Sequence, residues 1–162
     1  MNGVQSSPEK PGVVVICGPT ASGKTAVCQQ LAGHFSLEVV SADSRQIYRH
    51  MDIGTAKPTA SERACVRHHL VDIVDPDEDF TVAHFVESGR RIVADILSRG
   101  KLPVIAGGTG LYIQGLTAGL ADVPGPDPDF RQRMHRLAAN HDEGWLHRQL
   151  QQVDPVLAEK TD

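Results

Sequence analysis

The sequence predicts an α/β fold in which helices flank a parallel sheet, and three observations favour this class. Residues 18–25 read GPTASGKT, which fits the phosphate-loop pattern of Gly, four residues and Gly-Lys-Thr. Short apolar, β-branched runs alternate with segments of helical periodicity. The glycines of residues 107–110 do not form GxGxxG, which disfavours a dinucleotide-binding fold. Together these features predict a P-loop NTPase-like parallel sheet with flanking helices.

The composition suits one globular domain with an aliphatic core. The chain has 162 residues, of which 40% are hydrophobic, 22% charged and 4% aromatic, with a net charge of −4 that gives no sign of a nucleic-acid partner. Cys17, Cys28 and Cys65 lack metal-ligand spacing, which favours reduced thiols. Residues 1–12 predict a flexible N-terminal tail rather than a signal peptide, and no apolar run is long enough to span a membrane. We therefore expect a cytoplasmic protein that makes no membrane contact.

The phosphate loop lies between a strand and a helix, as this motif requires. Val13–Cys17 predicts a fully buried parallel strand, and apolar residues after the loop recur at helical spacing. The glycines let the backbone amides point inward, the helix N-terminus attracts anions, and Lys24 adds a positive charge. The Thr25 hydroxyl can hold Mg²⁺ against a phosphate oxygen. The predicted phosphate-binding residues are Gly18, Pro19, Thr20, Ala21, Ser22, Gly23, Lys24 and Thr25.

Asp43 follows a second predicted strand, residues 37–41. In an open parallel sheet the carboxyl ends of the strands gather ligands, so Asp43 is expected near the phosphate loop. A helix cap or a turn carboxylate is the alternative role for Asp43. The irregular segment 46–59 follows, in which Lys57 is a possible further phosphate contact.

The middle of the chain offers two further candidate sites. A short helix capped by Ser61 is predicted over residues 61–66, and a buried third strand over residues 70–74. His68 and His69 are adjacent, so their side chains diverge on a strand, and hydrogen-bonding structural roles are favoured over metal binding. Asp75 has either the role of a strand-ending Mg²⁺ aspartate or that of an ordinary turn residue, and the neighbouring acids favour the turn.

A long amphipathic helix is predicted over residues 82–99, capped by Thr81 and ended by Gly100. A fourth strand, residues 102–106, then opens into a glycine-rich loop that carries Thr109. Bare backbone with one hydroxyl suits close contact with a substrate, and a tight strand-to-helix turn is the simpler alternative.

The composition changes at residues 120–128, where three prolines alternate with small and acidic residues. We therefore divide the chain into a core of residues 13–119 and a second subdomain of residues 120–162. The second part predicts amphipathic helices over residues 129–139 and 143–151, and a third that begins at Asp154. Ordinary helix solvation explains its basic residues unless an anionic polymer docks there; they are Arg131, Arg133, Arg136 and Arg148.

Six motifs, taken in order and spacing from about residue 13 to 157, resemble the tRNA dimethylallyltransferase (tRNA isopentenyltransferase, or IPP transferase) family. They are GPTASGKT (Gly18 to Thr25), SADSRQIY (Ser41 to Tyr48), MDIGTAKP (Met51 to Pro58), HHLVDIVDP (His68 to Pro76), FTVAHF (Phe80 to Phe85) and AGGTGLYIQGL (Ala106 to Leu116).

The resemblance implies transfer of a dimethylallyl group from dimethylallyl diphosphate to the N6 amine of the adenosine 3′-adjacent to the anticodon in tRNA. It implies that the phosphate loop holds the leaving diphosphate with Lys24 and Mg²⁺, that Asp43 is the general base, and that Thr109 lies beside the reacting centre. Residues expected to contact the tRNA anticodon stem-loop are Asp43, Ser44, Arg45, Gln46, Thr109 and Arg131. We expect the enzyme to be a monomer.

Members of this family continue well past residue 162, so the resemblance implies an incomplete sheet and only the first part of a helical, tRNA-binding insertion. Prenyl transfer by this chain alone is therefore not expected to match that of a full-length relative. Three alternatives stay open: a P-loop kinase acting on a nucleotide or small metabolite, an adenylate isopentenyltransferase, and a non-catalytic nucleotide- or RNA-binding module.

Overall fold

The computed structural model describes residues 12–120, 125 and 127–161 of the chain. Contacts within it divide the chain into two units, Met1–Ala121 and Asp122–Asp162, which meet inside the segment 120–128 where the sequence changes composition. The tail predicted for residues 1–12 lies outside the described residues apart from Gly12.

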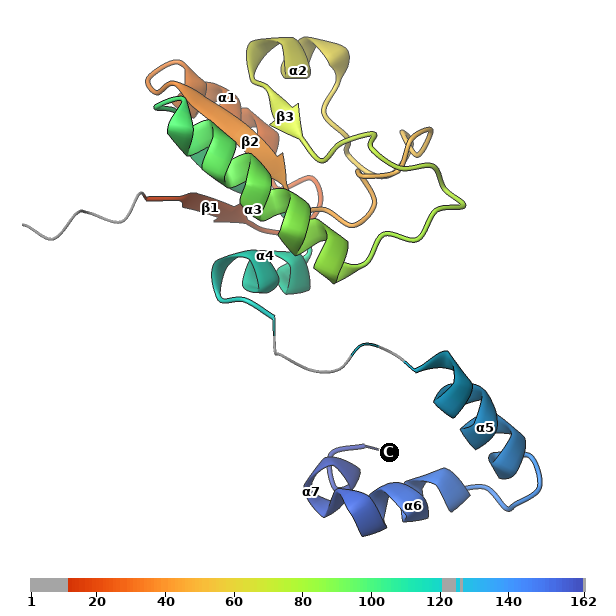
Figure 1. Ribbon diagram of the computed structural model, residues 1–162. Helices are drawn as coiled ribbons and strands as arrows, with labels where there is room; N and C mark the ends of the chain where they lie inside the picture. Colours follow the sequence, from red (N-terminus) through yellow and green to blue (C-terminus); the bar gives the residue numbers. More distant parts are fainter. Residues whose placement is uncertain (1–11, 121–124, 126, 162) are drawn as a thin grey trace, which may run out of the picture. The chain divides into compact units, whose positions relative to one another are not determined.

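The first unit is built on a four-stranded parallel sheet (Figure 1). Its strands are β1 (Val14–Cys17), β2 (Leu37–Ser41), β3 (His68–His69) and β4 (Leu102–Gly107), in the order β1-β4-β2-β3. The central strand β4 lies between β1 and β2, with Cys17 opposite Gly107 and Ser41 opposite Ala106. The carboxyl ends of these three strands therefore meet at one edge of the sheet.

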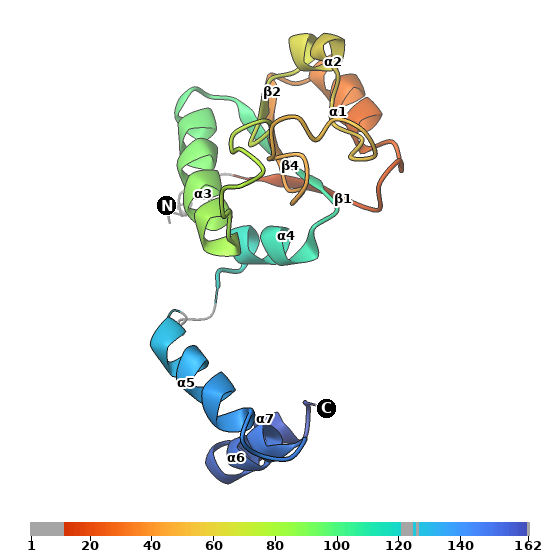
Figure 2. The ribbon, with the colours of Figure 1, turned by 90° about the vertical axis from the view of Figure 1, so that its right-hand side faces the viewer.

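Helices cover both faces of this sheet, as Figure 2 shows. They are α1 (Lys24–Ala32), α2 (Ala60–Cys65), α3 (Val82–Ser98) and α4 (Gly110–Thr117). Alternate residues of a strand face opposite sides, so each face buries its own cluster. Val39 and Val104 pack with Cys28 of α1, whereas Val40 and Ile105 face α3 and α4.

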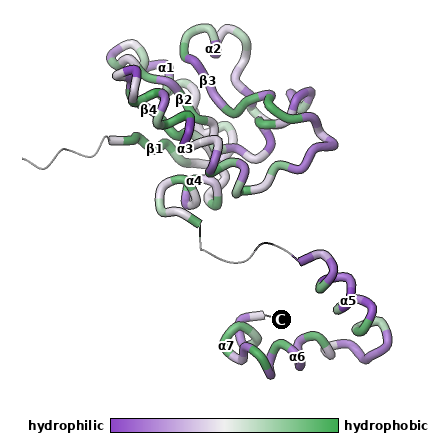
Figure 3. The backbone as a smooth tube through the Cα atoms, in the orientation of Figure 1, coloured by the Kyte–Doolittle hydropathy of each residue, from purple (hydrophilic) through white to green (hydrophobic). Residues whose placement is uncertain are grey.

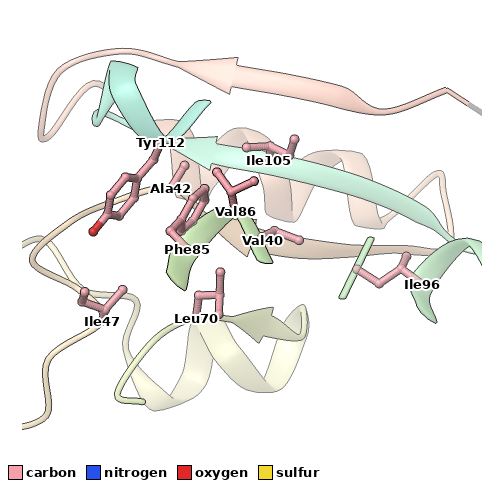
Figure 4. Close-up of a cluster of buried hydrophobic side chains, with 9 residues drawn as sticks. All are labelled: Val40, Ala42, Ile47, Leu70, Phe85, Val86, Ile96, Ile105 and Tyr112. Carbon is pink, nitrogen blue, oxygen red and sulfur yellow. The ribbon is translucent and has the colours of Figure 1, made fainter. Parts of the chain in front are cut away.

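The larger cluster joins α3 and α4 to the sheet (Figure 4). The rings of Phe85 and Tyr112 stack with their centroids 4.2 Å apart and a 12° angle between their planes. Burying an aromatic side chain of this size contributes about 2 kcal/mol. The cluster comprises Val40, Ala42, Ile47, Leu70, Phe85, Val86, Ile96, Ile105 and Tyr112.

The predicted fold class and three of the four predicted strands are confirmed, and so is the long helix. Thr81 caps α3, and its hydroxyl accepts a hydrogen bond from the backbone of His84. The predicted cap of α2 is wrong: Thr59 caps it in place of Ser61. A capping box explains the difference, because Glu62 reaches back to the Thr59 backbone.

The third strand predicted over residues 70–74 is also wrong. The strand that pairs with β2 is only His68–His69, and the chain then leaves the sheet. Leu70 and Asp72 both have positive φ values, 60° and 57°, which a continuing strand does not allow. The chain regains one isolated bridge at Val74, opposite Tyr48.

Strand β1 departs from the prediction of a fully buried strand. Val14 and Val15 remain 36% and 40% exposed, because β4 is the neighbour of β1 among the described residues and its other edge is uncovered there. A run of valines is typical of a strand that a longer sheet would bury. The run does not show whether the strand lies at the edge or in the centre of its sheet.

The second unit consists of α5 (Pro128–Ala138), α6 (Trp145–Val153) and α7 (Pro155–Ala158). Asp127 caps α5 and Asp154 caps α7, each followed by a proline that suits the first helical position. In Figure 3 α5 is largely hydrophilic, whereas α6 and α7 alternate between the two colours. Across the described parts of both units, no helix combines the length and apolarity that crossing a membrane requires.

Candidate active site

A pocket of about 360 Å³ lies at the sheet edge where the carboxyl ends meet. One wall is the phosphate loop, the second is Asp43 beyond the end of β2, and the third comes from the segment after Gln46. Its lining residues are Thr20, Ala21, Ser22, Gly23, Lys24, Thr25, Ala26, Asp43, Gln46, Thr55, Ala56, Lys57 and Glu62. The prediction that Asp43 lies near the loop is therefore confirmed.

The phosphate loop has the backbone of an anion cradle. Ala21 and Gly23 have positive φ values of 63° and 85°, which turn successive amides inward. Helix α1 begins at Lys24, and no side chain in the described part of the protein caps its N-terminus. The N–H groups of its first turn and the helix dipole therefore face the pocket without a competing acceptor.

Lys24 folds over this loop. Its Nζ donates hydrogen bonds to the carbonyl oxygens of Gly18 at 2.9 Å and Pro19 at 2.6 Å. A phosphate oxygen is a stronger acceptor than either carbonyl because it carries charge. Lys24 can therefore exchange these bonds for contacts with an anion in the same cradle.

Asp43 closes a turn and also borders the pocket. Its Oδ1 accepts hydrogen bonds from the backbone N–H groups of Arg45 at 2.9 Å and Gln46 at 3.3 Å, so it closes an Asx turn. The half-buried carboxyl also lines the pocket beside Lys24 and Thr25. The turn fixes one oxygen of a carboxylate that borders the phosphate loop.

Thr109 and Ser44 join the ends of β4 and β2 at the same edge. The Oγ1 of Thr109 accepts a hydrogen bond from Ser44 N at 3.0 Å and donates to Ser44 Oγ at 3.3 Å. The backbone N–H of Thr109 donates to Ala42 O at 3.1 Å. Among the predicted site residues of the first unit, Gly18, Pro19, Ser44, Arg45 and Thr109 are not in the pocket lining.

Gly107 lies where the ends of two strands approach closely. A Cβ atom at this position would lie 2.0 Å from the carbonyl oxygen of Ala42. The absence of a side chain here permits the two strand ends to touch. The same approach brings Gly18 N within 3.3 Å of Gly107 O, which anchors the start of the phosphate loop.

The side chain of Gln46 shapes the pocket wall. Its Oε1 accepts a hydrogen bond from Ser41 Oγ at 3.0 Å, and its Nε2 donates to the carbonyl oxygens of Thr55 and Ala56 at 3.1 and 3.0 Å.

The sequence made Lys57 a possible phosphate contact, but its ammonium donates hydrogen bonds to three oxygens of its own chain. That network does not favour a phosphate contact for Lys57.

Both histidines have the structural role that the sequence favours. His68 Nδ1 lies 2.7 Å from Val66 O, and His69 Nε2 lies 2.7 Å from Glu38 Oε2. Burial lowers the pKa of His68 below its usual value. In the described ranges no three His, Cys, Asp or Glu side chains gather to hold a metal.

Asp75 forms an ion pair with Arg49 at 3.1 Å in an exposed loop, as expected for an ordinary turn residue.

The sequence analysis missed Glu38, a carboxylate only 1% exposed. It accepts hydrogen bonds from Arg99 Nη2 at 2.8 Å, Lys101 Nζ at 2.8 Å and His69 Nε2 at 2.7 Å. The Arg99 guanidinium, helped by Lys101 and His69, holds the pKa of Glu38 well below its usual value despite burial. A glutamate inside the short apolar run 37–41 is the signal that could have revealed it.

Arg131, a predicted tRNA contact, belongs to the second unit, where it lies exposed on α5. Its neighbours Arg133 and Arg136 are also exposed, with Arg133 over the Phe130 ring and Arg136 bonded to Gln132.

Strand, phosphate loop and helix, together with a carboxylate at the next strand end, define the first unit as a P-loop protein of the α/β class. Two family models match the chain. The model described as IPP transferase covers residues 46–162, and that described as isopentenyl transferase covers residues 11–80. The chain belongs to the IPP transferase family.

Individual relatives agree with this assignment. The chain is 58% identical to tRNA dimethylallyltransferase 1 of Syntrophotalea carbinolica and 50% identical to tRNA dimethylallyltransferase of Methylococcus capsulatus; both alignments cover 94% of this chain. They cover 48% and 49% of the relatives, so the chain spans about half their length.

Two solved structures resemble the fold. One is full-length tRNA isopentenylpyrophosphate transferase from Bacillus halodurans, with 41% identity, a TM-score of 0.68 and coverage of 94% of this chain and 51% of that chain. The other is a eukaryotic dimethylallyltransferase acting on tRNA, with 30% identity, a TM-score of 0.80 and coverage of 94% and 38%.

Proposed function

We propose that this protein transfers a dimethylallyl group from dimethylallyl diphosphate to the N6 amine of the adenosine 3′-adjacent to the anticodon in tRNA, with release of diphosphate. One observation carries the proposal: in a member of the IPP transferase family, the phosphate loop and the Asp43 carboxylate line a single pocket. A leaving diphosphate and an attacking amine need these two groups side by side.

The phosphate loop serves the leaving group. As the allylic C–O bond breaks, negative charge grows on the diphosphate, and donors already aimed at it stabilise that charge. The inward amides between Gly18 and Thr25 and the N-terminus of α1 supply such donors. Lys24 supplies the cation once it exchanges its two carbonyl acceptors for phosphate oxygens.

Asp43 serves the acceptor. An exocyclic amine is a weak nucleophile, and a carboxylate within hydrogen-bond reach can take its proton as the new C–N bond forms. The Asx turn supports this assignment because it orients one carboxyl oxygen and restricts the rotation of the group. Thr109 supports it indirectly by holding Ser44, the next residue.

The donor set fits Mg²⁺. Thr25 borders the pocket together with the phosphate loop, and a hard hydroxyl oxygen of this kind is a ligand that Mg²⁺ accepts. When bound, Mg²⁺ would neutralise part of the charge on the diphosphate.

The tRNA would be held by both units. The target base must leave its stack to reach a pocket of this kind. Ser44, Arg45, Gln46 and Thr109 are proposed to contact the adenosine and its neighbours, while Arg131 is proposed to contact the anticodon stem from the second, insertion-like unit. Such an enzyme would work in the cytoplasm as a monomer.

A direct assay tests the proposal. The 162-residue chain, continued by the C-terminal half of the Syntrophotalea carbinolica relative and called here the completed chain, is incubated with dimethylallyl diphosphate, Mg²⁺ and unmodified tRNA. Mass spectrometry of the anticodon-loop nucleosides is expected to show one added dimethylallyl group on the adenosine. No modified adenosine, with tRNA and diphosphate both bound, would contradict the proposal.

Parallel reactions separate the alternatives. Prenylation of free AMP but not of tRNA would identify an adenylate isopentenyltransferase. ATP turnover with a small acceptor and no dependence on dimethylallyl diphosphate would identify a P-loop kinase. Binding of nucleotide or RNA without any turnover would leave a binding module.

A further inference from the structure

We infer that Lys57 is a positioning residue that clamps one wall of the phosphate-loop pocket and does not itself bind phosphate. This inference rests on the proposed function, because it concerns how the pocket takes a diphosphate. It gives a use to a lysine that the phosphate-binding and base assignments leave without one.

The ammonium of Lys57 is fully occupied by its own chain. Its Nζ donates to Tyr48 O at 2.9 Å, Asp52 Oδ1 at 2.7 Å and Asp72 Oδ1 at 2.6 Å. An ammonium has three N–H donors, so these acceptors use all of them. The Lys57 side chain is 5% exposed. Burial alone would lower the pKa of Lys57, and the two carboxylates outweigh it and raise that pKa.

The loop that Lys57 contacts has an unfavourable backbone conformation. Between Gln46 and Pro58 the chain forms a loop in which His50 and Ala56 adopt positive φ values of 64° and 48°. Non-glycine residues adopt this region only at a cost in free energy. Thr55 and Ala56 from this loop line the pocket opposite the phosphate loop.

Two sets of hydrogen bonds hold this loop in place. On one side the amide of Gln46 donates to the carbonyls of Thr55 and Ala56. On the other, Lys57 ties the loop to Asp72, whose backbone N–H donates to Gln46 O at 3.1 Å. Both sets of hydrogen bonds therefore join the loop to Gln46, which follows the end of β2 together with Asp43.

Asp72 is itself a fixed anchor. Its Oδ2 accepts a hydrogen bond from Arg63 Nη1 at 2.6 Å. Arg63 is not part of the pocket lining, and its side chain is 39% exposed. Arg63 thus offers a matched control, since its loss removes a charge partner of Asp72 and leaves the tie between Lys57 and the loop intact.

The experiment compares four forms of the 162-residue chain: wild type, Lys57→Met, Lys57→Met/Asp72→Asn and Arg63→Met. Inorganic diphosphate with Mg²⁺ is titrated calorimetrically, thermal unfolding is followed by circular dichroism, and amide hydrogen exchange is measured over residues 46–58. The double variant removes the partnered charge together with Lys57, so it keeps the test valid if Lys57→Met alone unfolds.

In Lys57→Met we expect about tenfold weaker diphosphate binding and faster exchange at Thr55 and Ala56, because a loosened wall must be ordered on binding. The double variant should recover its melting temperature and keep both defects, which separates positioning from stability. Arg63→Met should bind within about twofold of wild type, since a partly exposed ion pair contributes little.

Two results overturn the inference: wild-type exchange over residues 46–58 in a folded Lys57 variant, or the same loss of diphosphate affinity in Arg63→Met. If the wild type itself fails to bind diphosphate, the proposed phosphate cradle is wrong, and the exchange data still decide whether Lys57 holds the loop.

Discussion

The side-chain oxygen of Thr109 accepts a hydrogen bond from the backbone N–H of Ser44 at 3.0 Å, across 65 residues of sequence. This bond ties the turn that orients Asp43 to the end of the central strand β4. The residue beside the proposed base is thus fixed from a second strand, and the geometry of the base depends on a hydroxyl that lies outside the pocket lining.

Thr109→Val is therefore expected to lower the rate of prenyl transfer by the completed chain about tenfold, because a slightly misplaced base is a poorer one. The substitution keeps the shape of the side chain and removes its hydrogen bonds with Ser44. Thr109→Ser keeps the hydroxyl and should retain most of the activity. Equal activity of the Val and wild-type proteins would contradict the positioning role.

Asp43→Asn separates the two roles of Asp43. An amide oxygen can still accept from Arg45 N and Gln46 N, so the free energy of unfolding should stay within about 0.5 kcal/mol of wild type. The amide cannot take a proton, so transfer should fall by about a thousandfold. The measurement is single-turnover transfer by the completed chain with saturating tRNA. Substantial transfer by the Asn variant would remove Asp43 as the base.

Glu38→Gln should alter the pH dependence of stability. The pKa of Glu38 is depressed in the folded chain, so its ionised form stabilises the fold above its ordinary pKa of 4.5, and this contribution fades as the pH falls below that value. Urea unfolding at neutral pH should show a loss of about 2 kcal/mol, limited because Arg99 and Lys101 can turn to water. The difference between wild type and variant should shrink at pH values well below 4.5. A constant difference across that range would contradict the assignment.

Gly107→Ala should destabilise the first unit by about 3 kcal/mol, because the new methyl group would overlap the Ala42 backbone, which has little room to move. Gly110→Ala is the matched control: it lies three residues along, and nothing stands within 4 Å of its Cβ position. Thermal unfolding of both variants tests the contrast. Similar melting temperatures would show that the two strand ends can separate.

Val15→Lys should reduce aggregation of the 162-residue chain, since in the described part of the chain β1 pairs on one edge only and its valines are partly exposed, and a charge there opposes strand pairing between molecules. Ile53→Lys is the control, because Ile53 is 98% exposed in a loop outside the sheet. Light scattering during concentration measures the effect. An equal improvement in both variants would attribute aggregation to exposed apolar area rather than to the strand edge.

Local patterns were sufficient for much of the fold. The strands predicted at residues 37–41 and 102–106 are short apolar runs beside turn residues, and the structure has both, the second one residue longer. The spacing of its glycines was enough to predict the phosphate loop. Asp43 was predicted near the loop because strand ends in a parallel sheet share one edge.

The failures have a common physical origin in long-range contacts. The run 70–74 looks like a strand, yet Leu70 and Asp72 adopt positive φ values while the Asp72 carboxylate binds Lys57 and Arg63. Glu38 is buried with partners from distant parts of the chain, namely Arg99 and Lys101 in the turn between α3 and β4 and His69 of β3. A local sequence pattern does not include these distant partners. An apolar run also does not show which strand will pair with it.

The strand order has a consequence for folding. Strand β1 lies beside β4, with Val14 opposite Val104, and the backbone N–H of Gly18 donates to Gly107 O. A nascent chain that has not reached residue 102 already holds the whole phosphate-loop sequence but has no strand against which to lay β1. We therefore expect the phosphate loop to become ordered only after residues 102–107 are available to pair with β1.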